Sequence, residues 1–210
     1  MQTIDFTYAL EAEIEAAYRE RLKNSPKLPR LGWRFLYSPA RVLNGAKVAF
    51  LGLNPGGSTL NPDHAVFSAE TGSAYRRTVE DWGKSASLQD QVMALFKRLS
   101  VNPEDVLASN LIPFRSSKEC SVKTDKAAIN FGAKLWRQVF THAQPSLVIT
   151  MGQLTNTTIS SLLGVQSTES YPVQWGELCA HRGKFPGGTW IGLPHLSHFK
   201  IMKRDASKKH

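Results

Sequence analysis

The chain has 210 residues, of which 41% are hydrophobic and 20% are charged, so a wholly disordered chain is excluded and one globular domain is expected. The formal net charge is +9 and the pI is near 9.7. This charge favours a polyanionic partner, with nucleic acid ahead of an anionic membrane surface. The two cysteines, Cys120 and Cys179, cannot complete a four-thiolate zinc site or an iron–sulfur cluster.

The first predicted element is a helix over residues 8–23, in which Leu10, Ile14 and Tyr18 fall on one side. Residues 24–46 are basic and irregular, and they alternate cations with aromatic side chains. We interpret this segment as a strap whose aromatic residues pack on the core. A nucleic-acid contact is the secondary interpretation.

Short apolar runs then alternate with helical patterns along the rest of the chain. The predicted strands are residues 47–53, 105–112, 145–151 and 189–194. The predicted helices are residues 87–99 with Ser87 as N-cap, 124–142 opened by Thr124 and Asp125, and 152–163. We also expect a long loop from Asn54 to about residue 86 that is either functional or contains short helices. An extended segment is expected over 170–180, and a short basic helix after His195.

This alternation is typical of βαβ units. We therefore expect an α/β fold with three α/β/α layers and a mostly parallel central sheet of about four strands. The chain is expected to form a single domain over 1–210, with the N-terminal helix and basic strap in 1–46 and the core in 47–204. Ligands of such sheets bind outside the carboxyl ends of the strands. Three of those ends carry Asn54, Asn110 and His195.

Several common sites are excluded by their missing motifs. The sequence has no phosphate-binding P-loop, no GxGxxG dinucleotide fingerprint, no GxSxG elbow and no zinc-deaminase motif. His195 and His198 are three residues apart but have no evident third ligand, so no metal and no cofactor are expected. No apolar run of membrane-spanning length occurs, and the start lacks a secretory signal, so we expect a cytoplasmic protein.

Two short motifs remain, GLNPG at residues 52–56 and LPHLS at residues 193–197. Each alone fits an ordinary turn or a capped strand end. Together, and with Asn110 between them, they resemble the uracil-DNA glycosylase superfamily. The first motif of that family reads GQDPYH in uracil-specific enzymes and GINPG or GMNPG in other branches. The last motif is HPSP, or NPS in the mismatch branch. Residues 64–68, HAVFS, are similar to the family's AHGLxFS segment.

The resemblance implies a monofunctional DNA glycosylase, an enzyme that flips a base out of DNA and hydrolyses its N-glycosidic bond. Asn54 would position the attacking water, and His195 would donate to the oxygen that gains negative charge. Asn110 would read the base edge, and Phe67 would stack on the base. The base pocket would also include Gly52, Leu53 and Gly56.

The resemblance also implies a DNA-binding surface. Gly57 would allow backbone N–H groups to approach the nucleic acid, and Ser197 would hold a phosphate. The loop around the last motif would supply the other DNA contacts. Phe199, or alternatively Leu196, would insert into the gap that the flipped base leaves in the DNA. The candidate DNA-binding residues are Gly57, Ser197, Leu196, His198, Phe199 and Lys200.

The sequence departs from the family at two informative positions. Gly56 replaces the Tyr that blocks a 5-methyl group in uracil-specific enzymes, so uracil, thymine and 5-hydroxymethyluracil are all candidate bases. Leu196 stands where Pro is usual, so the last loop has an altered shape. The alternatives are a non-catalytic nucleic-acid-binding protein on the same fold, and an unrelated α/β enzyme with a small phosphate or nucleotide ligand. We expect a monomer whose partner is single- or double-stranded DNA.

Overall fold

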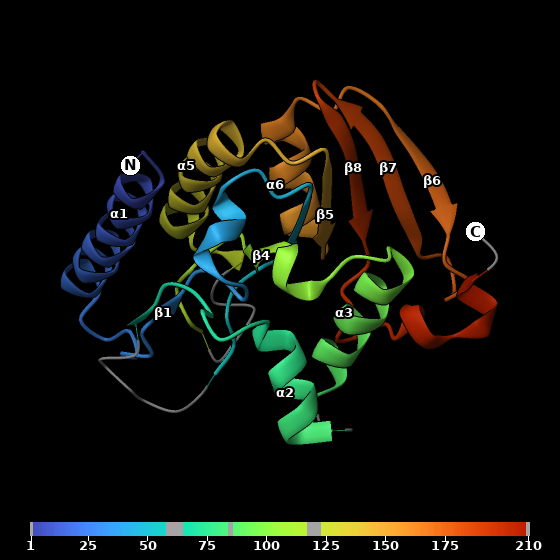
Figure 1. Ribbon diagram of the computed structural model, residues 1–210, viewed down its shortest axis with the longest axis horizontal. Helices are drawn as coiled ribbons and strands as arrows, with labels where there is room; N and C mark the ends of the chain where they lie inside the picture. The colour runs from blue at the N-terminus through green and yellow to red at the C-terminus, as the bar shows by residue number, and fades with distance from the viewer. Residues whose placement is uncertain (1, 58–64, 84–85, 117–122, 209–210) are drawn as a thin grey trace.

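The computed structural model describes residues 2–57, 65–83, 86–116 and 123–208. His64 and Cys120, which entered the sequence analysis, lie outside these residues. A six-stranded sheet forms the centre of the fold, with strand order β4-β2-β5-β8-β7-β6 (Figure 1). Its strands are β2 (Val48–Gly52), β4 (Leu107–Asn110), β5 (Leu147–Met151), β6 (Thr168–Pro172), β7 (Cys179–Phe185) and β8 (Gly188–Leu193).

The four predicted strands are confirmed as β2, β4, β5 and β8, which pair in parallel. The expectation of about four strands is wrong for the whole sheet, because β6 and β7 extend it as an antiparallel pair. The predicted extended segment, residues 170–180, spans the turn between these two strands. The side chains of β6 are mostly exposed and β7 is largely polar, so neither strand produces the apolar run of a buried strand.

The described α-helices are α1 (Gln2–Asn24), α2 (Ala74–Trp82), α3 (Ser87–Arg98), α5 (Lys126–Ala143) and α6 (Gln153–Leu163). Helix α2 lies inside the predicted long loop. Asp125 caps α5 as predicted, with its side chain accepting the Ala128 N–H at 2.9 Å. The predicted cap of α3 is wrong, because Ala86 occupies the N-cap position and no side chain caps this helix. Two short 3₁₀ helices, Ile201–Lys203 and Asp205–Lys208, replace the predicted closing helix.

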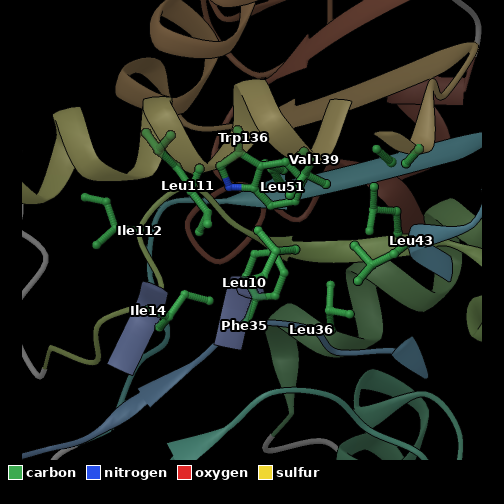
Figure 2. Packing of buried hydrophobic residues seen from close by; sticks show 14 of the residues in the cluster. Leu10, Ile14, Phe35, Leu36, Leu43, Leu51, Leu111, Ile112, Trp136 and Val139 are labelled. Carbon is green, nitrogen blue, oxygen red and sulfur yellow. The ribbon is translucent and has the colours of Figure 1, made fainter. Parts of the chain in front are cut away.

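Alternating strand residues enter two hydrophobic clusters on opposite faces of the sheet. In β2, Leu51 joins the first cluster and Phe50 the second. The first cluster contains residues of α1, α5 and α6, and Figure 2 shows Leu10 and Phe35 packed near Trp136. The second contains residues of α2 and α3. Helices therefore cover both faces of the sheet, as the α/β prediction requires.

The N-terminal helix and the strap are integrated with this core. Trp33 and Phe35 are buried in the first cluster, which confirms the packing interpretation of the strap. Trp33–Arg34 forms strand β1, which pairs in parallel with β3 (Ala65–Val66). The Trp33 indole N–H donates to Glu15 of α1 at 2.6 Å. In the described ranges, no helix is long and apolar enough to cross a membrane.

Candidate active site

A pocket of about 300 Å³ lies where the chain leaves β2, β4 and β8. It contains three residues that the sequence analysis selected for chemistry, Asn54, Asn110 and His195. The carboxyl ends of parallel strands meet at one edge of a sheet, and this topology explains why residues so distant in sequence converge. The described residues that line the pocket are Tyr37, Leu53, Asn54, Gly56, Tyr75, Leu88, Gln89, Asn110, Ser116, Met151 and His195.

Asn54 follows β2 and is half-buried in the pocket wall. Its side-chain amide Nδ2 donates to the Pro55 carbonyl at 2.9 Å. Because a carbonyl can only accept, this contact assigns the NH₂ group and leaves Oδ1 as the hydrogen-bond acceptor. An amide oxygen in this position can accept a hydrogen bond from a water molecule.

Asn110 is the last residue of β4, and hydrogen bonds fix both its backbone and its side chain. Its backbone carbonyl accepts from the Trp136 indole N–H at 2.9 Å, and its Nδ2 donates to the Tyr37 hydroxyl at 3.2 Å. The sheet register sets Gly52 opposite Asn110. A Cβ at Gly52 would lie 2.5 Å from Asn110 Oδ1, so only glycine leaves room for this amide. Gly52 thus supports the pocket without lining it.

Tyr37 and Tyr75 form an aromatic wall that the sequence analysis did not assign to the site. Their rings stack with centroids 4.7 Å apart and an interplanar angle of 9°. The Arg34 guanidinium lies 4.5 Å from the centroid of the Tyr37 ring, an arrangement that suits a cation–π contact. Burial raises the pKa of Tyr37 above its ordinary value of 10.0. The Tyr37 hydroxyl is therefore neutral at physiological pH and can donate as well as accept.

His195 follows β8 with a defined tautomer. Its Nδ1 lies 3.3 Å from the Ser197 backbone N and 2.7 Å from Ser197 Oγ. A backbone N–H can only donate, so Nδ1 is the acceptor and the neutral ring carries its proton on Nε2. Gly152, at φ +85°, lies against the ring, and a Cβ there would come within 3.2 Å of His195 Cδ2. Ser197 thus orients His195.

The turn after β2 has space next to Gly56. Among the described residues, no atom lies within 4 Å of the position that a Cβ at Gly56 would take. The Gly56 carbonyl accepts from Arg115 Nη1 at 3.2 Å, and Gly57 lies against the same guanidinium. Burial lowers the pKa of Arg115 below its ordinary value, yet a guanidinium keeps its charge near neutral pH. A cation therefore supports the pocket rim at the glycine turn.

Two predicted site residues lie elsewhere. Phe67 does not line the pocket, because the pairing of β1 with β3 brings it into the core, where its ring lies 5.4 Å from that of Phe35. Leu196 is completely buried in the second cluster, so it is not available as a wedge between bases. Its neighbours His198 and Phe199 line a separate groove next to His195, and Lys200 is exposed.

Within the described ranges, no group of three or more His, Cys, Asp or Glu residues is arranged to hold a metal ion. The His195 and His198 rings are neighbours, with centroids 5.0 Å apart. Cys179 is a free thiol. The polar side chains that line the pocket are amides, hydroxyls and a histidine, and the rest of the lining is aromatic or aliphatic. This combination suits hydrogen bonding to a polar ligand that is partly enclosed by apolar side chains.

Comparisons with models of known protein families and with curated protein sequences give no match for this chain.

Proposed function

We propose that this chain is a monofunctional DNA glycosylase that hydrolyses the N-glycosidic bond of an extruded pyrimidine. One observation carries the proposal: Asn54, Asn110 and His195, selected from separate motifs, line the same pocket. Amides, an oriented histidine and aromatic rings are the groups needed to bind a flipped base.

The chemistry assigns each group a role. As the bond from C1′ to the base nitrogen breaks, the sugar becomes cation-like and the base gains negative charge. Asn54 Oδ1 would hold the water that attacks C1′, positioning it more than deprotonating it. The Nε2–H of His195 would donate to the base oxygen that carries the developing charge. Water supplies hydroxide to the sugar, and the base leaves with the remaining proton.

The base-reading wall favours a pyrimidine with a keto group. Asn110 Nδ2 carries two hydrogens, one of which reaches Tyr37, and the other can donate to a carbonyl oxygen. Asn110 Oδ1 can accept from an adjacent ring N–H. Uracil and thymine present this pair of groups, whereas cytosine presents an amine in place of the keto oxygen.

The aromatic lining of the pocket is Tyr37 and Tyr75, whereas Phe67 does not line it. Tyr75 covers one face of the Tyr37 ring and the Arg34 guanidinium covers the other, so a bound base would contact the edge of this wall and would not stack on Tyr37. The space next to Gly56 leaves room for a substituent at C5. The proposal therefore extends to uracil, thymine and 5-hydroxymethyluracil.

The test is base release from oligonucleotides that each carry one of these three bases, cytosine or a modified cytosine. Both single-stranded and double-stranded forms are incubated with the protein and then cleaved with alkali at abasic sites. We expect cleavage with at least one keto pyrimidine and none with cytosine. Tight, salt-sensitive binding without cleavage of any substrate would instead indicate the non-catalytic nucleic-acid-binding protein.

A further inference from the structure

A groove of about 810 Å³ begins at His195, on the other side of this residue from the base pocket. His195 lines both spaces, so a chain bound in the pocket can continue into the groove. Helix α6 forms one wall with Asn156, Thr157 and Ser160, and β7 contributes His181. The amide of Asn156 and the hydroxyls of Thr157 and Ser160 are uncharged hydrogen-bonding groups. They suit the oxygens of sugars and phosphates.

Next to this groove, Trp175, Phe199 and Arg204 form an aromatic and cationic surface that we call the ledge. Phe199 lines the groove, and the Trp175 ring lies 6.0 Å from it at an interplanar angle of 74°. Trp175 is 36% exposed, and among the described residues only it and Tyr8 are exposed large hydrophobic side chains. The Arg204 guanidinium lies 5.1 Å from the centroid of the Trp175 ring and donates to the Gln174 carbonyl.

The charge around the ledge selects a polyanion. Residues 200–208, KIMKRDASK, contain one acidic residue, Asp205, among several cations. Glu177 is the single acidic residue in the described groove lining. An exposed aromatic ring beside a guanidinium is a typical stacking platform for a nucleic-acid base. Bases in a duplex are already stacked on their neighbours, so only an unpaired base can use such a platform.

We propose that the groove binds a single-stranded segment of nucleic acid and that an unpaired base of this segment stacks on Trp175. The inference rests on the proposed function in one respect, that the nucleotide next to this segment enters the pocket at His195. It adds a binding site outside the base pocket, and it predicts a preference for strands that are single or opened at the target.

The test measures binding of a labelled twelve-residue oligothymidine and of a matched duplex by fluorescence anisotropy at low salt. Trp175→Ala is expected to weaken binding of the single strand about 10- to 100-fold, the loss typical of one base–aromatic stack. Binding of the duplex should change less than twofold. Trp175→Phe keeps an aromatic face and should recover most of the affinity. Tyr8→Ala is the matched control, since Tyr8 is the other exposed aromatic residue and lies on α1.

Equal affinity of wild type and Trp175→Ala for the single strand would overturn the inference, as would an equal loss with the duplex. Absence of any oligonucleotide binding would also overturn it and would favour a protein partner at the ledge. The two proposals fail separately. Binding through Trp175 without release of any base contradicts the proposed glycosylase activity. Base release with unchanged binding by Trp175→Ala contradicts the proposed binding of a single strand in the groove.

Discussion

In the proposed function, Gly56 would decide how much space the pocket offers at the C5 side of a bound base. Its backbone φ is not positive, and a Cβ there meets no atom of the described residues within 4 Å, so a larger side chain is compatible with the backbone at this position. We expect Gly56→Tyr to reduce release of thymine and 5-hydroxymethyluracil at least about tenfold more than release of uracil. Initial rates on matched oligonucleotides measure this ratio. Gly56→Ala, which adds one methyl group, should leave it nearly unchanged, and an unaltered ratio in Gly56→Tyr would contradict the orientation of the base.

In the proposed function, the Tyr37 hydroxyl would act on the base through Asn110, whose Nδ2 donates to this hydroxyl at 3.2 Å. Tyr37→Phe keeps the ring stacked on Tyr75 but removes this contact, so the Asn110 amide loses its fixed orientation. We expect kcat/KM for uracil to fall about tenfold, the value of one neutral hydrogen bond of about 1 kcal/mol and some loss of orientation. The preference for uracil over cytosine should fall with it. A variant with lower stability but unchanged preference would assign Tyr37 a structural role only.

At the scale of elements, helix α5 holds the strand end that carries Asn110. Gly132 of α5 lies against the chain just after β4, and a Cβ there would come 2.3 Å from the Leu111 carbonyl oxygen. Gly132→Ala improves helix propensity by about 1 kcal/mol. The steric clash involves backbone and costs more, so we expect a net loss of about 1–3 kcal/mol in the free energy of unfolding. Denaturant unfolding measures it.

The control for this substitution is Lys134→Ala in the same helix. Lys134 is exposed and its ion pair with Glu13 is 3.0 Å long, so its loss should change stability by less than about 0.5 kcal/mol. A Gly132→Ala variant as stable as this control would show that the close approach of α5 to the end of β4 does not limit the side chain at position 132.

The contact between α1 and the strap predicts a pH dependence of stability. The hydrogen bond from the Trp33 indole lowers the pKa of Glu15 below its ordinary value of 4.5. A lowered pKa in the folded state stabilises the fold above about pH 4.5, and this contribution is lost as the pH falls through the folded-state pKa. Glu15→Gln should therefore be less stable than wild type at pH 7, with the difference shrinking below pH 4.5. Thermal unfolding across this range measures the difference. A stability difference that grows as the pH falls would contradict the lowered pKa of Glu15.

At the scale of the whole molecule, the four parallel strands were predictable because each is a short apolar run, buried on both faces. The convergence of Asn54, Asn110 and His195 follows from the same topology, since parallel strands end at one edge. The hairpin of β6 and β7 could not be predicted in this way. Its strands are polar and partly exposed, and they extend the sheet without entering its core as apolar runs.

The tyrosine wall depends on long-range packing that no local pattern encodes. The strap runs beside β4, where the Tyr37 N–H donates to the Ala108 carbonyl at 2.8 Å. This path brings Tyr37 next to Asn110. The aromatic residues of the strap were visible in the sequence, but the alternation of Trp33, Phe35 and Tyr37 did not distinguish the one that lines the pocket. Phe67 shows the converse, because a residue chosen for the similarity of its segment to a family motif is part of the core.

The central claim is that the pocket at the ends of β2, β4 and β8 breaks an N-glycosidic bond. The most direct test is the rate constant for uracil release from a single-stranded oligonucleotide, with protein in excess. We predict release by the wild type and a fall of about 10²- to 10⁴-fold in Asn54→Ala, which loses the group that positions water. Thr141→Ala, an exposed position on α5 outside both the pocket and the groove, is the matched control and should retain the rate within a few fold. If the wild type releases no uracil, thymine or 5-hydroxymethyluracil, or if Asn54→Ala releases the base at the wild-type rate, the claim is contradicted.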